Sequence, residues 1–281
     1  MSAIHALQPL YAIAAFAVGL LVGITGVGGG SVMTPLLILL FGMHPATAVG
    51  TDLLHAAVTR TAGSAVHGFN QTIDWRVARR MAAGSIPMAI VTLAALRALD
   101  INSTAAYVLI NAVLTLALLM TAITLVFRDR IAARYAARLG LLADRQIGVL
   151  TIAAGVVVGA IVSISSVGAG AIGVTALVLL YPKLPTVRIV GTEIAHAVPL
   201  TLVAGIGHWF LGSVDLQVFA SLIVGSVPGI LLGSYAAVRI PETALRLVLA
   251  AMLIAVATKL SFGLLPSSGG NVVAVKTVAP H

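Results

Sequence analysis

The stretch Gly23-Ile24-Thr25-Gly26-Val27-Gly28-Gly29-Gly30-Ser31 lies where two short apolar runs, 9–25 and 31–42, meet. Glycine in a helix interior lowers helix stability by about 1 kcal/mol relative to alanine, so this stretch predicts a break between two helices. From Leu10 to Gly42 the two runs are too long for one membrane crossing and too short for two complete crossings with a loop. We therefore expect two short or re-entrant helical segments here, broken at the glycines, and two more at the start of the second half, where a weaker glycine motif recurs at 163–170.

The composition of the whole chain places it in a membrane. Hydrophobic residues make up 60% and charged residues only 9% of its 281 positions, whereas soluble domains carry about 25% charged residues. Ten apolar runs follow one another, and most are near the length that crosses a bilayer. The sequence therefore predicts an all-α polytopic membrane protein surrounded by the lipid bilayer.

The ten runs form two sets of five with matching lengths. They lie at 9–25, 31–42, 46–69, 77–98, 103–127, 147–164, 170–181, 187–211, 217–239 and 243–264. We expect a first transmembrane repeat over 9–127, a basic connector over 128–146, a second repeat over 147–264 and a polar tail over 265–281. The connector contains five arginines, which is typical of a cytoplasmic loop. The net charge of +8 is therefore explained by topology, and we expect no nucleic-acid partner.

An internal duplication relates the two sets of runs. Gly28 and Gly30 match Gly168 and Gly170, which lie 140 positions later. After one inserted residue, Gly50-Thr-Asp-Leu-Leu-His55 matches Gly191-Thr-Glu-Ile-Ala-His196. Polar and glycine residues that match in one register are hard to obtain by chance, so the chain is a repeat of two homologous halves.

The loop charges predict that the two halves have opposite orientations in the membrane. The turn at 70–80 contains three arginines and its counterpart at 211–221 contains no Lys or Arg. The turn at 42–48 has no Lys or Arg, whereas its counterpart at 181–188 has two basic residues. Positively charged loops face the cytoplasm, so we expect an inverted-topology repeat with both termini on the outer side.

The third run of each half carries ionisable residues on one helix face. These are an acid and two histidines in each half: Asp52, His55 and His67, and then Glu193, His196 and His208. A charged residue at the centre of a membrane helix costs about 2.5–3.5 kcal/mol on insertion scales, so such residues indicate function. We predict that the six residues take up and release protons. The alternatives are local acid–histidine pairs that fix helix packing, or capping of a helix start by each acid.

Arg60 lies on the same face as Asp52 and has no charged counterpart, because Thr201 occupies its position in the second half. A buried guanidinium binds an oxyanion through two parallel hydrogen bonds. We predict that Arg60 binds a small anion. An internal salt bridge between Arg60 and Asp52 is the alternative.

The two glycine segments add candidate hydrogen-bond donors. Half-helices that start near Ser31 and Ala171 present unpaired N–H groups and a partial positive charge at their N-termini. Close helix packing through small residues is the alternative. With Arg60, the predicted substrate-binding residues are Thr25, Gly28, Gly29, Gly30, Ser31, Ser165, Ser166, Gly168 and Gly170.

Several paired motifs resemble the TauE/SafE sulfite exporter family, also called the TSUP family. In the first half they are Gly26-Val-Gly-Gly-Gly30 with Pro35, Gly50-Thr-Asp-Leu53, His67 with Asp74-Trp75, and Gly84-Ser-Ile-Pro87. Their second-half counterparts are Gly191-Thr-Glu, His208, Gly212-Ser-Val-Asp215 and Gly225-Ser-Val-Pro228. The resemblance extends over residues 10–264.

This resemblance implies a secondary transporter for sulfite or a related sulfur-containing anion, such as a sulfonate, in the cytoplasmic membrane of a prokaryote. Transport by alternating access is implied, with proton coupling as an option, and we expect no enzyme activity, cofactor or metal. Two alternatives remain. Asp52-x-x-His55 and Glu193-x-x-His196 are similar to ligand pairs of carboxylate-bridged metalloenzymes, and a passive anion channel would need no coupled ion.

Overall fold

The structure is a computed structural model that describes residues 8–25, 30–101, 103–139, 142–236 and 242–264. These residues form ten helices joined by turns. The first five are α1 (Pro9–Thr25), α2 (Gly30–Leu39), α3 (Pro45–Phe69), α4 (Trp75–Ala98) and α5 (Thr104–Leu139). The second five are α6 (Asp144–Ser165), α7 (Ala171–Leu180), α8 (Thr186–Phe210), α9 (Leu216–Ala236) and α10 (Glu242–Leu264). The predicted all-α architecture is confirmed.

Five of the described helices are long and apolar enough to cross a membrane, namely α4, α5 as far as Arg128, α6, α8 and α9 as far as Gly233. α3 has 25 residues, but Asp52, His55 and Arg60 lower its hydropathy. α1 has 17 residues, and α2 and α7 have 10 each. α6, with 22 residues, is long enough for a full crossing. The chain is therefore a multi-pass membrane protein in which α2 and α7 are short segments.

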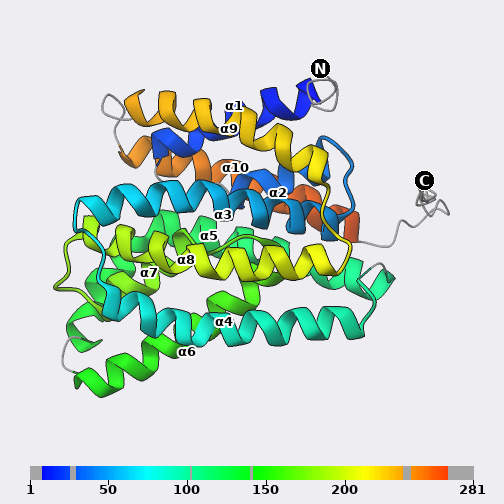
Figure 1. Ribbon diagram of the computed structural model, residues 1–281. Helices are drawn as coiled ribbons and strands as arrows, with labels where there is room; N and C mark the ends of the chain where they lie inside the picture. Colours follow the sequence, from blue (N-terminus) through cyan, green and yellow to red (C-terminus); the bar gives the residue numbers. More distant parts are fainter. Residues whose placement is uncertain (1–7, 26–29, 102, 140–141, 237–241, 265–281) are drawn as a thin grey trace.

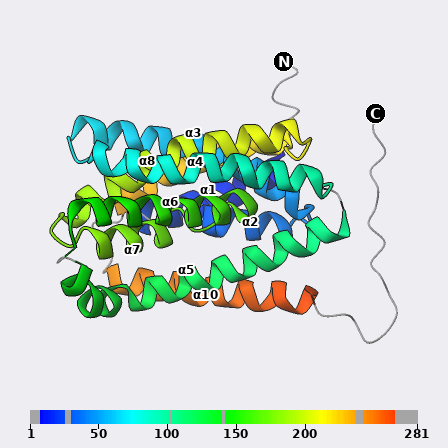
Figure 2. The ribbon, with the colours of Figure 1, turned by 90° about the horizontal axis from the view of Figure 1, so that it is seen from below.

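The most closely packed helix pairs each join a helix of the first half to a helix of the second half. α1 packs along α9 at one edge of the bundle, and α4 packs along α6 at the opposite edge (Figure 1). α3 and α8 lie side by side between these pairs, while α5 and α10 lie together along another edge (Figure 2). In the repeat, α1 corresponds to α6 and α9 to α4. The same contact is therefore made twice with the halves exchanged, as a pseudo-two-fold axis requires.

Glycines bring the exchanged helices into backbone contact. A Cβ atom at Gly84 of α4 would lie 2.1 Å from the carbonyl oxygen of Ile152 in α6. A Cβ atom at Gly225 of α9 would lie 2.0 Å from the carbonyl oxygen of Ala12 in α1. The two contacts are equivalent in the repeat, so the same steric requirement explains why both halves carry glycine here.

Two aspartates cap α4 and α9 and tie these helices to the bundle centre. Asp74 accepts hydrogen bonds from the backbone N–H groups of the second and third residues after it, and Asp215 does the same in the other half. Their own N–H groups donate to Thr192 Oγ1 at 2.8 Å and to Thr51 Oγ1 at 3.0 Å. Each cap therefore joins one half to the central helix of the other half.

The connector predicted over 128–146 begins as a helix. α5 continues past residue 127 to Leu139, because arginine and alanine, which dominate this segment, are strong helix formers. At the start of α6, Asp144 Oδ2 accepts hydrogen bonds from Arg76 Nη2 at 2.8 Å and from Arg80 Nη2 at 2.9 Å. The end of the connector is thereby anchored to α4.

Candidate functional site

The two central helices, α3 and α8, bury the predicted ionisable residues. Asp52 is 0% exposed, Glu193 2% and Arg60 8%. His55 and His196 are also buried. The two acids lie about two turns inside their helices, which begin at Pro45 and Thr186. Capping of the α3 and α8 starts by these acids is therefore excluded.

Asp52 is held by residues from three separate segments. Its Oδ2 atom accepts a hydrogen bond from Thr34 Oγ1 of α2 at 2.6 Å and another from Ser166 Oγ, just after α6, at 2.9 Å. His55 Nδ1, one turn along α3, lies 3.4 Å from Asp52 Oδ1. The predicted local acid–histidine pair is thus present, and the predicted Ser166 joins it from the second half.

The two buried histidines form matching hydrogen bonds across the halves. His55 Nε2 lies 2.8 Å from Ser226 Oγ, and His196 Nε2 lies 2.8 Å from Ser85 Oγ. The sequence analysis missed both serines as partners of the histidines. The available signal was their place in the paired Gly-Ser-x-Pro motifs of α4 and α9, beside glycines that require close packing.

Arg60 pairs with the acid of the other half. Its Nη1 atom lies 4.0 Å from Glu193 Oε1 on α8. The salt bridge between Arg60 and Asp52, considered above, is not the ion pair that the structure forms. A Cβ atom at Gly173 of α7 would lie 3.1 Å from the Cγ and Oε1 atoms of Glu193. Glu193 thus lies close to the guanidinium of Arg60 and to the backbone of α7.

Each acid–histidine set contains two buried polar atoms without a hydrogen-bond partner among the described residues. These atoms are Asp52 Oδ1, His55 Nδ1, Glu193 Oε1 and His196 Nδ1. An unsatisfied buried donor or acceptor costs about 1–3 kcal/mol, so such atoms are uncommon and favour a functional role. Asp52 Oδ1 and His55 Nδ1 lie 3.4 Å from each other, and binding of a proton or of the substrate at these atoms stays a prediction.

Several polar groups of the second glycine segment form hydrogen bonds within the protein. α6 ends at Ser165, and Ser166 (φ 59°) and Gly168 (φ 108°) take left-handed backbone angles. Ser165 Oγ donates to the Ile161 carbonyl at 2.7 Å. The Gly168 carbonyl accepts hydrogen bonds from the N–H groups of residues 172 and 173 at 3.1 and 3.2 Å. The substrate contacts predicted for Ser165, Gly168 and Gly170 therefore stay a prediction.

The first glycine segment lies mostly outside the described residues. Gly28 and Gly29 fall in the range 26–29, which the structure does not describe. For Thr25 and Gly30, the described feature is the helical backbone at the end of α1 and the start of α2. Ser31 is buried in the first turn of α2. The substrate contacts of this segment also stay a prediction.

His67 and His208 lie at the C-terminal ends of α3 and α8, next to the following turns. His67 Nδ1 lies 2.8 Å from Thr72 Oγ1, and His208 Nδ1 lies 3.0 Å from Ser213 Oγ. His208 Nε2 also bonds the carbonyl of Ser163 at 2.9 Å. The structure thus connects both histidines to turns, and a role for them in proton transfer stays a prediction.

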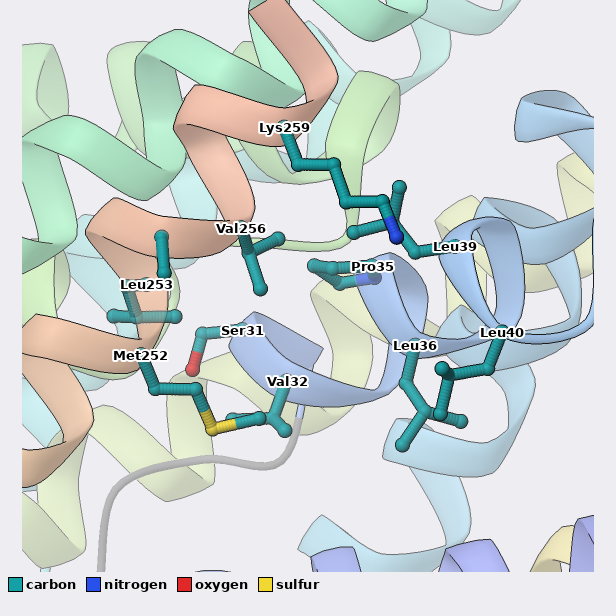
Figure 3. Close-up of a pocket in the computed structure, with 11 residues that line it drawn as sticks. Ser31, Val32, Pro35, Leu36, Leu39, Leu40, Met252, Leu253, Val256 and Lys259 are labelled. Carbon is teal, nitrogen blue, oxygen red and sulfur yellow. The ribbon is translucent and has the colours of Figure 1, made fainter.

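A cavity of about 300 Å³ lies between α2 and α10 (Figure 3). Its walls are apolar side chains, including Pro35 and Leu36, with Ser31 near one end and Lys259 on α10 near the other. Thr34 faces away from this cavity, because its hydroxyl bonds Asp52 on α3. α2 therefore separates the cavity from the buried acids, and apolar walls of this kind do not solvate a small oxyanion.

The acids and histidines of the described residues do not form a metal site. No group of three or more of their His, Asp and Glu side chains gathers closely enough to hold a metal ion. Among the described residues, the acid–histidine pair within 4 Å is Asp52 with His55.

The family model described as "Sulfite exporter TauE/SafE" matches residues 11–260. The chain belongs to the TauE/SafE family. It is 37% identical over 246 residues to "Probable membrane transporter protein YjnA" of Bacillus subtilis (strain 168), a match that covers 86% of this chain and 95% of that protein. It is also 37% identical over 71 residues to "Probable membrane transporter protein YunE" of the same organism, covering 25% of this chain and 26% of that protein. No solved structure matches the chain significantly. This TauE/SafE protein is a membrane transporter.

Proposed function

We propose that this chain is a secondary transporter for sulfite or a related small sulfur-containing anion, such as a sulfonate. The observation that carries the proposal is Arg60, a buried arginine on the central helix α3 whose Nη1 lies 4.0 Å from Glu193 Oε1. Charge-assisted hydrogen bonds of arginine are about 2.7–2.9 Å long, so the guanidinium keeps donor capacity for an oxyanion. The name of the matching family supports a sulfur oxyanion as the substrate class.

Hydroxyl and backbone groups from both halves complete the proposed site. The buried hydroxyls of Ser166, in the break after α6, and of Thr34, on α2, both bond Asp52, which lies two turns before Arg60 on α3. The glycine segments 28–31 and 165–170 supply further N–H and hydroxyl donors to the anion in this proposal. The inverted arrangement of the halves favours alternating access, in which the two halves open the site to each side in turn.

Protons are the coupling ion in this proposal. Asp52, His55, Glu193 and His196 are buried, and each carries a polar atom without a hydrogen-bond partner among the described residues. In this proposal, these carboxylates and imidazoles take up and release the coupled protons. His67 and His208 extend this set toward the ends of α3 and α8. We place the protein in the cytoplasmic membrane of a prokaryote with both termini outside.

Flux into proteoliposomes tests the proposed function. Purified protein is reconstituted, and uptake of labelled sulfite is compared with uptake of sulfate, thiosulfate and an alkyl sulfonate, with and without a pH gradient. We expect saturable flux of sulfite or a sulfonate that exceeds that of empty vesicles. The absence of flux for every sulfur anion would overturn the assignment, and flux that ignores both saturation and pH would indicate a channel.

A further inference from the structure

The two buried acids occupy equivalent positions in the repeat but have different partners. Asp52 Oδ2 accepts hydrogen bonds from Thr34 and Ser166 at 2.6 and 2.9 Å. Glu193 accepts no side-chain hydrogen bond from the described residues at Oε1, and its ion pair with Arg60 is 4.0 Å long. Asp52 is thus fixed by two hydroxyl donors, whereas the ion pair of Glu193 Oε1 with Arg60 is longer than a hydrogen bond. Of the two acids, Glu193 is the one that a competing anion can displace.

An anion that binds Arg60 would be repelled by an ionised Glu193, because both would lie beside the same guanidinium. Arg60 and Glu193 are 8% and 2% exposed, and an ionised Glu193 balances the charge of Arg60. An anion bound at Arg60 would place a second negative charge beside Glu193 in a poorly solvated region. A buried carboxylate without a counter-ion becomes neutral by taking up a proton. Binding of the anion and protonation of Glu193 are therefore linked.

The ionisable groups around Glu193 come from the helices that pack against α8, which are α3, α4, α6 and α7. α7 contains no titratable side chain between Ala171 and Leu180. Those of α4 lie in its first two turns and its last turn, and those of α6 lie in its first turn. The complete set on these helices and α8 is Asp52, His55, Arg60 and His67; Arg76, Arg79, Arg80 and Arg97; Asp144 and Arg145; and Arg188, His196 and His208.

His196 is the competing proton acceptor, because it lies one turn beyond Glu193 on the same helix. Its Nδ1 atom has no hydrogen-bond partner among the described residues, while its Nε2 atom bonds Ser85. A proton on His196 would add a second positive charge near Arg60 and would leave the Arg60–Glu193 ion pair in place. A proton on Glu193 instead removes the negative charge that competes with the substrate for Arg60. Either proton gives the site the same net charge, but only protonation of Glu193 removes the ion pair that the anion has to replace, so its contact with Arg60 favours Glu193.

We propose that the substrate anion replaces Glu193 as the counter-ion of Arg60, and that Glu193 carries one proton with each singly charged anion. This inference rests on the proposed function, because it needs an anion at Arg60. The anion accepts N–H hydrogen bonds from the guanidinium, and a proton from the aqueous side where the site is open adds to Glu193 Oε1. After the site opens to the other side, the anion leaves and the proton returns to water. No net charge crosses the membrane.

The test measures accumulation of methanesulfonate, which stays singly charged over the working pH range, in proteoliposomes with the membrane potential clamped to zero. One proton for each anion predicts about tenfold accumulation for a gradient of one pH unit. Glu193→Gln resembles the protonated acid, so this variant binds the anion but carries no proton. We expect its accumulation to fall to the level without a gradient, and its affinity for methanesulfonate, followed by thermal shift, to lose its dependence on pH.

Asp215→Asn is the matched control. It also converts a carboxylate to an amide, but at the start of α9, where asparagine still caps the helix. This variant should accumulate the anion as the wild type does. Glu193→Asp, which retains an acid, should keep the response to the pH gradient and shows whether loss in Glu193→Gln reflects misfolding.

The outcomes separate this inference from the proposed function. If the wild type moves no sulfur anion, the proposed function fails. If the wild type moves methanesulfonate without any response to the pH gradient, or if Glu193→Gln accumulates it as the wild type does, the role of Glu193 is overturned. Retained coupling in Glu193→Gln together with its loss in His196→Gln would assign the proton to His196 instead.

Discussion

Ser166 Oγ donates a hydrogen bond to Asp52 Oδ2 over 2.9 Å, which joins the helix break of the second half to the buried acid of the first. A hydrogen bond to a charged group contributes about 1.5–3 kcal/mol to stability. We expect Ser166→Ala to lower the free energy of unfolding by this amount, measured by thermal or denaturant unfolding in detergent. Thr61→Ala is the control, because this exposed hydroxyl bonds a carbonyl of its own helix. Equal stability of the two variants would contradict the prediction.

The reciprocal histidine–serine bonds give a test of the pseudo-two-fold arrangement. Ser85→Ala and Ser226→Ala each leave the Nε2 atom of a buried histidine without its partner. The loss from an unsatisfied buried group is about 1–3 kcal/mol. We expect the two variants to be destabilised by similar amounts in the same unfolding assay. A large loss in one and none in the other would show that the two bonds are not equivalent.

Gly84 should not tolerate a larger residue. Alanine at this position places its Cβ 2.1 Å from the Ile152 carbonyl oxygen, so α4 and α6 must separate. Overpacking of this kind costs about 1–3 kcal/mol. Gly63 on α3 is the matched control, because its Cβ would meet Ile194 Cγ2 at an ordinary 3.6 Å. Gly63→Ala should be neutral or stabilising, since alanine favours a helix by about 1 kcal/mol. Similar unfolding midpoints for both variants would contradict the close packing.

The sequence predicted the helices well because their signals are local. Apolar length and glycine breaks predicted ten runs whose bounds lie within a few residues of most of the observed helices. The exception is α5, which continues to Leu139. Arginines mark a segment outside the bilayer, but they also favour a helix, and a hydropathy pattern does not distinguish a polar helix from a polar loop.

The partners of the buried side chains could be predicted only in part. Asp52 and His55 are three residues apart on one helix, so helical geometry alone pairs them. Arg60 lies on the same face, but its partner is Glu193, 133 positions away, since 60 and 193 meet only when α3 packs along α8. A helix face shows which residues point together, whereas the neighbouring helix is decided by packing. For the same reason, the sequence did not show that Ser85 and Ser226 bond the buried histidines.

The proposed orientation of the two halves can be tested by labelling. The chain contains no cysteine, so single cysteines can be introduced without further changes. Asn70→Cys and Leu211→Cys lie at equivalent positions, in the turns after α3 and α8. The inverted topology predicts that Asn70→Cys reacts with an impermeant maleimide only from the cytoplasmic side, and Leu211→Cys only from the outside. Reaction of both from the same side of intact cells would contradict the inverted repeat.

Arg60 carries the proposed anion site, so its substitution should separate transport from folding. We expect Arg60→Ala to reduce sulfite or sulfonate flux about 100-fold or more, because the guanidinium is the proposed cationic ligand of the anion. Arg60→Lys keeps the charge but loses the paired N–H groups, and its affinity should fall about tenfold. Arg79→Ala is the control, because this exposed arginine bonds only the Trp75 carbonyl among the described residues. All three variants should elute as folded protein in size-exclusion chromatography. Flux at the wild-type rate in Arg60→Ala would remove Arg60 from the mechanism, and with it the ion-pair exchange proposed for Glu193.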